Sequence, residues 1–324
     1  MGIGILETYE FDVVIIGGGP AGCTCALYTS RANLKTVILD KNPAVGALAI
    51  THKIANYPGV SGEMSGEALL DSMRNQAVEY GTAYKRAQVF GIDVSGEMKK
   101  VYTPEGTFTG RALVLATGAM GRSGASFEGE SEFLGRGVSY CATCDGAFYR
   151  DREVAVVGLN PEAVEEAQFL TKFASMVHWI TFKDPGKDDF HAEDLLSMSN
   201  VKHWRRSRLA AIEGNEGGVT GVKVKQKDAG EPLSLEVEGV FVYQNGSKPI
   251  TDFAGDQVEY NADGGVKVDD AMSTSVPGVW AIGDIRNTPY KQAVVAAGDG
   301  CIAAMAIDRY LNHRKTVKPD WDHS

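Results

Sequence analysis

Hydrophobic residues near the N-terminus form two continuous runs, separated by glycines and by a stretch of small residues. The first run starts at Phe11, glycines occupy residues 17–19, and the second run ends at Asp40. A continuous apolar run bounded by turn residues is typical of a strand buried on both faces of a parallel sheet. With the small-residue helix between the runs, the pattern predicts a complete β-α-β unit.

A second unit of this kind follows further along the chain. Residues 154–170 predict a buried strand, a tight turn and a helix, and residues 176–183 predict the next strand. Further strands are expected around residues 219–227 and 235–243. Strands that alternate with helices in this way favour parallel sheets of the Rossmann kind.

Two other apolar runs each end in a turn that contains glycine. RALVLATGAM covers residues 111–120, and VPGVWAIGDIR covers residues 276–286. Both resemble the later strands of flavin-binding domains of the two-dinucleotide type. A glycine followed by an acid, here Asp284, at the carboxyl end of a strand can hold the ribityl chain of FAD.

The order of these elements predicts an α/β fold with two dinucleotide-binding, Rossmann-like domains, the second inserted into the first. We expect residues 1–122 and 248–324 to form a discontinuous FAD-binding domain. Residues 123–247 are expected to form an inserted redox domain, similar to an NADPH domain, that carries a Cys-Ala-Thr-Cys segment. The Gly-, Ser- and Pro-rich stretches GRSGASFEGE and QNGSKPITDFAG fit the two crossings between them.

Composition narrows the possible partners and the location. The 324 residues include 32 Lys and Arg against 42 Asp and Glu, and the net charge of -10 argues against nucleic acid as a partner. No apolar run reaches the ~18 residues of a membrane span, and MGIGILETYE lacks the features of a secretory signal. The 5 cysteines are too few for a secreted disulfide scaffold. We therefore expect a cytoplasmic protein with no membrane partner.

The first β-α-β unit carries the pattern of a dinucleotide-binding turn. Gly17, Gly19 and Gly22 fit G-x-G-x-x-G. The middle glycine lets the backbone approach a pyrophosphate at the helix N-terminus, and Asp40 stands where an acid accepts hydrogen bonds from a ribose. The alternative is a glycine turn that serves only helix packing. The flanking strand, helix and acid favour the dinucleotide.

The CATCD segment holds the candidate redox chemistry. Cys141 and Cys144 have the C-x-x-C spacing, which permits a reversible disulfide between the two thiols. A helix N-terminus can lower the pKa of one of them. A metal site would need a further pair of ligands, so we expect none. Asp145 is a candidate acid-base group, and a helix cap is its alternative role.

The segment GRGVSYCATCDGAFYR at residues 135–150, together with GGGPAG, IANYPG, ATGA and IGDIR, closely resembles the low-molecular-weight thioredoxin reductases along nearly the whole chain. The resemblance implies a homodimer with one FAD per subunit. It also implies that Cys144 is the flavin-proximal sulfur, that Cys141 attacks thioredoxin, and that Asp145 donates the proton.

The same resemblance assigns the FAD site by position. Fifteen residues of the family pattern line the FAD: Gly17, Gly19, Pro20, Ala21, Gly22, Asp40, Gly46, Leu48, Asn56, Thr117, Gly118, Asp284, Lys291, Gln292 and Ala293. The chain departs from the family at two of these places. Residues 45–48 read Val-Gly-Ala-Leu where the family has Gly-Gly-Gln-Leu, and residues 291–292 read Lys-Gln where it has Arg-Gln.

The inserted domain departs further from the family, at its nucleotide turn. The family's Gly-Gly-Gly-Asp-Ser-Ala is Gly-Leu-Asn-Pro-Glu-Ala at residues 158–163. Asn160 adds a side chain where the phosphate approaches, and Glu162 adds a charge that repels it. The family's His-Arg-Arg, which grips the 2'-phosphate of NADPH, is Thr-Phe-Lys at residues 181–183, and Lys cannot bind phosphate as bidentate Arg does. We therefore expect NADPH binding to be absent.

This combination resembles the pyridine-nucleotide-independent branch of the family, the ferredoxin-dependent flavin thioredoxin reductases, formerly called deeply rooted thioredoxin reductases. The resemblance implies that reduced ferredoxin is the electron donor and thioredoxin the acceptor. It also implies that a C-terminal aromatic residue, here Trp321, covers the flavin, with a frayed terminus as the alternative. A basic cluster could receive the acidic ferredoxin, although such clusters are more often solvated surface; it contains Lys202, Arg205, Arg206 and Arg208.

Two other functions are alternatives to this hypothesis. One is an NAD(P)H-dependent thioredoxin reductase with an atypical nucleotide site, against which Asn160 counts. The other is a flavin-bearing binding or regulatory module that has lost turnover, against which the intact CATCD segment counts.

Overall fold

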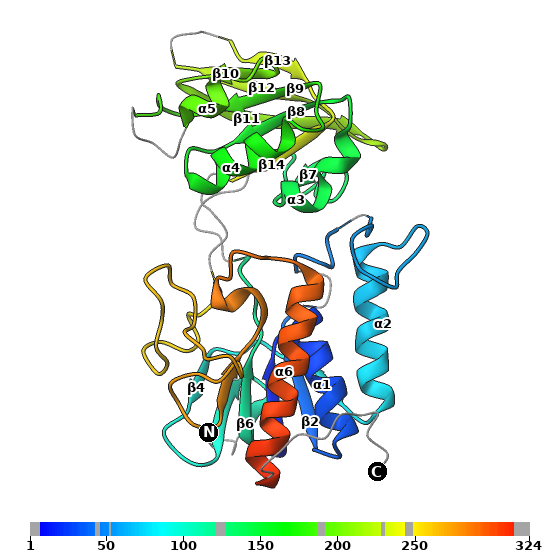
Figure 1. Cartoon of the computed structure of the whole chain (residues 1–324), viewed down its shortest axis with the longest axis vertical. Helices are drawn as coiled ribbons and strands as arrows, with labels where there is room; N and C mark the ends of the chain where they lie inside the picture. The colour runs from blue at the N-terminus through cyan, green and yellow to red at the C-terminus, as the bar shows by residue number, and fades with distance from the viewer. Residues whose placement is uncertain are drawn as a thin grey trace, which may run out of the picture. The chain divides into compact units, whose positions relative to one another are not determined.

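The structure is a computed structural model, and it describes residues 7–42, 46–51, 53–120, 127–186, 192–227, 231–243 and 249–313. The chain divides into two compact units (Figure 1). Unit 1 comprises residues 1–121 and 248–324, and unit 2 comprises residues 122–247. We describe each unit separately.

Unit 1 is built on a mixed seven-stranded sheet in the order β3-β2-β1-β6-β5-β4, with β15 paired to β6. Strands β1, β2, β3, β6 and β15 run parallel, whereas β5 pairs antiparallel with both of its neighbours, β6 and β4. The continuous apolar runs form the central strands, which are buried on both faces. The strands are β1 (Thr8–Ile16), β2 (Thr36–Asp40), β3 (Ala83–Arg86), β4 (Gly91–Asp93), β5 (Lys99–Thr103), β6 (Gly106–Leu115) and β15 (Val279–Ala281).

Three helices cover one face of this sheet, and α1 and α6 stand side by side in Figure 1. Small residues allow the two helices to approach closely, because a Cβ added at Gly300 of α6 would lie 2.3 Å from the carbonyl oxygen of Ala21 in α1. This approach brings the beginning of α1 next to the returning C-terminal part of the unit. The helices are α1 (Pro20–Arg31), α2 (Gly66–Glu79) and α6 (Ala293–Asn312), with a 3-10 turn η2 (Gly283–Arg286) before α6.

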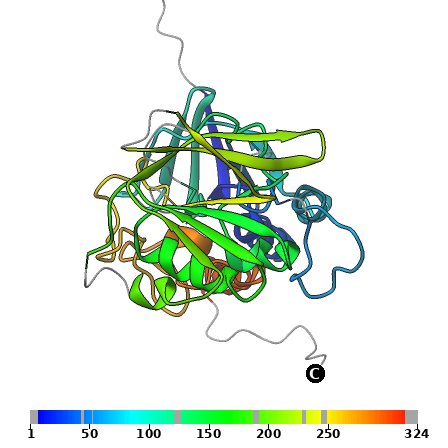
Figure 2. The same ribbon diagram turned by 90° about the horizontal axis from the view of Figure 1, so that it is seen from above.

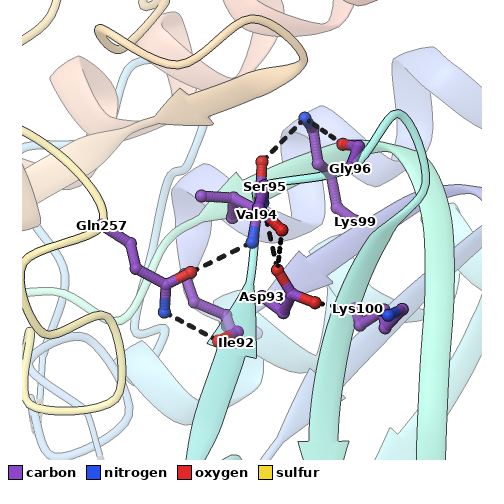
Figure 3. Close-up of polar contacts among 8 residues, drawn as sticks. All are labelled: Ile92, Asp93, Val94, Ser95, Gly96, Lys99, Lys100 and Gln257. Atoms are coloured by element: carbon purple, nitrogen blue, oxygen red, sulfur yellow. Dashed lines mark hydrogen bonds and ion pairs between the residues drawn. The ribbon is translucent and has the colours of Figure 1, made fainter.

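On the other face, one glutamine holds the β4–β5 hairpin against the returning chain (Figure 3). Gln257 Oε1 accepts the N–H of Val94 at 3.1 Å, and its Nε2 donates to the carbonyl of Ile92 at 2.7 Å. Lys99 Nζ closes the hairpin turn by donating to the carbonyls of Val94, at 3.1 Å, and Gly96, at 2.7 Å. The two bonds of Gln257 join segments that are 163 and 165 positions apart in sequence, and they satisfy backbone groups of the buried Ile92 and Val94.

Unit 2 has a parallel five-stranded sheet in the order β10-β9-β8-β14-β7 and an antiparallel three-stranded sheet in the order β11-β12-β13. The parallel strands are β7 (Val138–Ser139), β8 (Glu153–Val157), β9 (Met176–Ile180), β10 (Val201–Trp204) and β14 (Gly239–Val242). The antiparallel strands are β11 (Ser207–Asn215), β12 (Gly218–Gln226) and β13 (Leu233–Glu236).

The antiparallel sheet and the helices of unit 2 pack on opposite faces of the parallel sheet. One hydrophobic core joins β7, β8 and β14 to the antiparallel strands, and another joins β8, β9 and β14 to the helices. Figure 2 shows the green helices and the yellow-green strands on the two sides. The helices are α3 (Ala142–Asp145), η1 (Gly146–Tyr149), α4 (Pro161–Leu170) and α5 (Ala192–Leu196).

Both units thus have the strand-turn-helix organisation that the sequence predicts, with unit 2 inserted between the two parts of unit 1. The helix after β1 begins at a glycine-rich turn, and the helix after β8 begins at Asn160. None of the helices in the described part of the chain is both long and apolar enough to span a bilayer.

Candidate active site

The turn between β1 and α1 requires glycine at two positions. Gly17 has φ +108°, and a Cβ added there would lie 2.3 Å from the carbonyl oxygen of Ala116. A Cβ added at Gly22 would lie 2.0 Å from the carbonyl oxygen of Gly17. The helix start and the ends of β1 and β6 therefore meet without room for side chains.

Gly19 is glycine for a different reason. It is the N-cap of α1, with φ −74° and ψ −175°, it makes no side-chain capping bond, and Pro20 follows at the first helical position. A Cβ added at Gly19 would meet no heavy atom of the described residues within 4 Å. The first turn of α1 also contains no acidic residue. An uncapped helix start beside open space suits a phosphate, because the helix dipole and the amide groups stabilise its charge.

Asp40 ends β2 beside this turn. Its Oδ2 accepts a hydrogen bond from Tyr84 Oη at 2.8 Å, and a Cβ added at Gly18 would lie 2.5 Å from the same oxygen. Burial and the bond to Asp40 raise the pKa of Tyr84 well above its usual range, so Tyr84 stays a neutral donor. The carboxylate is thus fixed where the ribose of a dinucleotide on α1 would extend.

The turn after β6 is joined to the chain that returns from unit 2. Thr117 Oγ1 donates to the carbonyl of Ile250 at 2.6 Å, and the N–H of Ile250 donates to the carbonyl of Gly118 at 3.0 Å. Gln292 is the N-cap residue of α6, and its Oε1 accepts a hydrogen bond from Asn56 Nδ2 at 3.2 Å. Two residues that the family resemblance places at FAD, 236 positions apart, therefore touch.

Asp284 follows β15 and is half-buried, and Asp299 of α6 is buried beside the same turn. Burial raises the pKa of Asp284, and the charge of Lys291 acts in the opposite direction. Asp299 of α6, which is 5% exposed, accepts the N–H of Gly283 at 2.9 Å and pairs with Arg286 Nη2 at 2.7 Å. Asp299 therefore fixes the turn that presents Asp284, a role that no motif in the sequence indicates.

The other predicted cofactor residues lie around these elements. Gly46 and Leu48 belong to the turns that follow β2, Leu48 is buried in the core beside α1, and Ala293 begins α6. Trp321 lies outside the described residues, and so does the predicted cap over the flavin.

The described side chains fit FAD. Strands β1, β2, β6 and β15 are parallel, so the turns that follow them share one edge of the sheet. At this edge a Cβ added at Gly283 would lie 3.1 Å from Ala21 Cβ, which places the turn after β15 at the first turn of α1. The open helix start suits the pyrophosphate, and Asp40 and Asp284 suit the hydroxyl groups of the cofactor.

In unit 2, Cys141 directly precedes the short helix α3. It is half-buried and disulfide-bonded, and its Sγ lies 3.3 Å from Thr143 Oγ1. Of Cys144 the structure describes only its place in α3. The other three cysteines are free thiols: Cys23, Cys25 and Cys301. Oxidised Cys141 fits the predicted reversible disulfide.

The two cysteines of α1 are free thiols and do not fit a redox role. Cys23 and Cys25 are fully buried, and burial raises the pKa of Cys23 to about 12. A thiol with so high a pKa is a poor nucleophile at neutral pH, so these residues serve the core. Among the described residues no group of three or more His, Cys, Asp or Glu is arranged to hold a metal ion.

Asp145 ends α3 and is held by β7. Its Oδ2 accepts a hydrogen bond from Ser139 Oγ at 2.7 Å, and its N–H donates to the carbonyl of Cys141 at 3.1 Å. Asp145 occupies the N-cap position of η1 but makes no side-chain capping bond there. The alternative role as a side-chain cap is therefore absent, and the acid-base role stays a prediction.

Two residues beside the disulfide carry no motif and are missed by sequence reasoning. Glu166 of α4 and Tyr243, which follows β14, both bond the N–H of Ala142 at the start of α3. Their positions, 24 and 101 residues from Ala142, give no local signal. Only the packing of α4 and β14 against α3 brings them together.

The turn before α4 repeats the turn before α1, with one difference. Gly158 has φ +149°, and a Cβ added there would lie 2.9 Å from the carbonyl of Tyr243. Asn160 is the N-cap: its Oδ1 accepts the N–H of Ala163 at 2.8 Å and its Nδ2 donates to the carbonyl of Tyr243. Glu162 lies in the first helical turn. One amide that would face a phosphate thus already has a side-chain acceptor.

Basic side chains reach the end of β9 from a neighbouring turn. Asp184 Oδ1 lies 3.9 Å from Arg205 Nε, and Asp184 Oδ2 lies 3.6 Å from Arg206 Nε. Lys202 lies over the ring of Trp204, with Nζ 4.5 Å from the ring centroid. Both arginines belong to the turn between β10 and β11, so a search for basic residues along the segment after β9 does not find them.

Comparison with known proteins gives matches along nearly the whole chain. The model of a family described as pyridine nucleotide-disulphide oxidoreductase matches residues 11–300. A thioredoxin reductase of Aquifex aeolicus (strain VF5) is 46% identical over 316 residues, 96% of each chain. The structure of a thioredoxin reductase from Gloeobacter violaceus is 72% identical, with a TM-score of 0.59, and covers 97% of this chain and 98% of that chain. The structure of thioredoxin reductase from Streptococcus pyogenes MGAS5005 is 34% identical, with a TM-score of 0.88, and covers 95% of this chain and 100% of that chain.

Two dinucleotide-type units and a disulfide at a short helix define a flavin-dependent disulfide oxidoreductase. The matches agree with this class, and they confirm the predicted fold class. The chain belongs to the thioredoxin reductases, within the pyridine nucleotide-disulphide oxidoreductase family.

Two predictions from the sequence are wrong: membership of the pyridine-nucleotide-independent branch, and the absence of NADPH binding. The matching family model is that of pyridine nucleotide enzymes and spans the α4 turn, whereas a Ferredoxin-Flavin Thioredoxin Reductase from Clostridium acetobutylicum is 29% identical with a TM-score of 0.51. The physical reason lies in the turn. Asn160 occupies only one amide of the turn, the strand-turn-helix geometry is intact, and Arg205 and Arg206 lie beside Asp184 after β9.

The substitution Gly19→Val tests the assignment of FAD to α1. We expect the variant to fold, because the space at this position is open, and to retain less than about a tenth of the wild-type FAD, because the side chain blocks the approach of the pyrophosphate. Flavin absorbance per chain after purification, with circular dichroism, measures both. Gly298→Ala, at another open position, is the matched control. Full FAD content in Gly19→Val would place the cofactor elsewhere.

Proposed function

We propose that this chain is a thioredoxin reductase that passes electrons from a pyridine nucleotide, through FAD in unit 1, to the Cys141/Cys144 pair and then to thioredoxin. The observation that carries the proposal is the oxidised Cys141 at the start of α3, with Asp145 one helical turn away. The two dinucleotide-type turns in separate units support one flavin and one nicotinamide site.

The family resemblance gives the pair of sulfurs different roles. Reduction of the disulfide by two electrons and two protons produces two thiols, and FAD supplies the electron pair when bound. Loss of the Cys141 proton gives a thiolate, which attacks one sulfur of the thioredoxin disulfide. Attack of the Cys144 thiolate on the mixed disulfide then restores the enzyme disulfide and releases dithiol thioredoxin.

Asp145 is the proposed proton donor to the leaving thioredoxin sulfur. Ser139 Oγ donates to the Asp145 carboxyl at 2.7 Å, and also lies 3.1 Å from the N–H of Cys141, from which it accepts. One hydroxyl thus connects the carboxyl group to the backbone of the attacking cysteine. This chain of bonds fixes the orientation of Asp145 relative to α3, which a proton transfer requires.

The proposed donor is a pyridine nucleotide at the α4 turn. Gly158 and Ala163 keep the close strand-helix packing of such a turn, and the family match supports this donor over ferredoxin. Asp184 could bind a ribose hydroxyl, and Arg205 and Arg206 beside it could bind a 2'-phosphate. NADH and NADPH are therefore separate arms of the test. The homodimer and the cytoplasmic location stay predictions.

The substitution Cys141→Ser tests the thiol chemistry. We expect it to retain FAD and its reduction, and to lower thioredoxin reduction at least about a hundredfold, because a hydroxyl does not replace the nucleophilic thiol. Photochemical reduction of the flavin, followed by addition of thioredoxin disulfide, makes the result independent of the donor. Cys301→Ser removes another thiol and should have no effect. Normal thioredoxin reduction by Cys141→Ser would refute its role.

Anaerobic reduction of the flavin tests the electron donor. Excess NADPH, NADH or reduced ferredoxin is added to separate samples of the holoenzyme, and the loss of flavin absorbance is followed by stopped flow. We expect one or both pyridine nucleotides to bleach the flavin, with the faster one identifying the natural donor. Bleaching by ferredoxin alone would contradict the proposed donor while leaving the thiol chemistry intact.

A further inference from the structure

A half-buried carboxylate bonds the backbone amides that follow Cys141, at the start of α3. Glu166 lies in the second turn of α4, and its Oε2 accepts the N–H of Ala142 at 2.6 Å and the N–H of Thr143 at 3.1 Å. These are the first two amides after Cys141. An unpaired amide N–H at a helix start donates to anions, including a cysteine thiolate. In this protein the carboxylate already takes both amides.

Tyr243 completes the arrangement from the other side. Its hydroxyl donates to Glu166 Oε2 at 3.1 Å and accepts the N–H of Ala142 at 2.8 Å. The ring is 2% exposed and packs in the core between the parallel sheet and α4. Burial, and then the charge of Glu166, raise the pKa of Tyr243 well above its usual value. Tyr243 thus remains a neutral donor to the carboxylate at every working pH.

The groups around Glu166 act on its pKa in opposite directions, and the net effect is a pKa above the usual value. Burial raises the pKa of Glu166 and Glu162 acts in the same direction, whereas the hydrogen bonds from Tyr243, Ala142 and Thr143 oppose both. Asp145, at the end of α3, is a second acid in this segment, and its Oδ2 accepts a hydrogen bond from Ser139 Oγ. The surroundings of the disulfide described here are therefore acidic, with no Lys or Arg bonded to Glu166 in the described part of the chain.

We propose that Glu166 is a positioning residue of the redox pair: its carboxylate occupies the amides at the start of α3 and opposes formation of the Cys141 thiolate. This inference rests on the proposed dithiol function. Less stabilisation of the thiolate makes the reduced pair a stronger reductant, because stabilising the reduced form is what makes a disulfide oxidising. When the Cys141 thiolate does form, its higher basicity makes it a stronger nucleophile toward thioredoxin.

The substitution Glu166→Gln separates charge from hydrogen bonding, because the glutamine oxygen still accepts from the two amides. In a Cys144→Ser background, the rate of iodoacetamide labelling of Cys141 is measured against pH by peptide mass spectrometry. We expect Glu166→Gln to move the midpoint to lower pH and to raise the rate below the midpoint about threefold or more, where one pKa unit corresponds to about tenfold. Glu165→Gln removes the same charge from the exposed neighbouring position and should leave the midpoint unchanged.

Tyr243→Phe distinguishes electrostatics from a general loosening of α3. It removes the hydroxyl that stabilises the carboxylate but keeps the charge, so the midpoint should stay or move to higher pH. Equal midpoints for Glu166→Gln and Glu165→Gln would overturn the proposal. A downward shift in Tyr243→Phe equal to that in Glu166→Gln would also overturn it.

The labelling needs neither nucleotide nor thioredoxin, so its result is independent of the proposed electron donor. Failure of the flavin to accept electrons from a pyridine nucleotide would refute the donor and leave the midpoint test unaffected. If the protein reduces thioredoxin with a pyridine nucleotide but Glu166→Gln leaves the labelling midpoint of Cys141 unchanged, only the role of Glu166 is refuted.

Discussion

The amide groups at the start of a helix need an acceptor, and this protein meets that need differently at three helices. The start of α1 has Gly19 and no side-chain cap, so its amides are available to the pyrophosphate of FAD. The start of α4 is capped by Asn160. The start of α3 is bonded by Glu166, a residue of α4 itself. The three helix starts therefore differ in what accepts their amide hydrogen bonds: no side chain at α1, Asn160 at α4 and Glu166 at α3.

Much of the fold could be predicted from local pattern. The apolar runs that become β1, β2, β6 and β8 are continuous because these strands are buried on both faces, and Gly22 is required by a contact with Gly17 in the turn just before it. The redox character of Cys141, which is disulfide-bonded, was predictable for the same reason, since the C-x-x-C spacing is local. Asp299, Glu166 and Tyr243 were not, because each acts on a residue that packing alone brings near.

The two predictions that failed, the family branch and the absence of NADPH binding, also depended on long-range structure. The sequence lacks the middle glycine of the turn at Asn160 and the arginines of the segment after β9, and these two losses predicted that NADPH does not bind. In three dimensions Asn160 takes one amide of an intact turn, and Arg205 and Arg206 approach Asp184 from the turn between β10 and β11. A motif defined by consecutive residues does not include a cation that a neighbouring turn brings close in space. Motif loss is therefore weaker evidence of lost binding than motif presence is of binding.

The most direct test of this account is the binding of NADP⁺ to the oxidised holoenzyme and to its Asn160→Gly variant, followed by flavin difference spectra. Glycine frees the amide of Ala163 at a cost of a few tenths of a kcal/mol in helix stability. The account predicts measurable binding to the wild type and binding about fivefold tighter to the variant, the equivalent of one hydrogen bond. Absence of binding to both proteins would contradict it, because the α4 turn would then not be a nucleotide site.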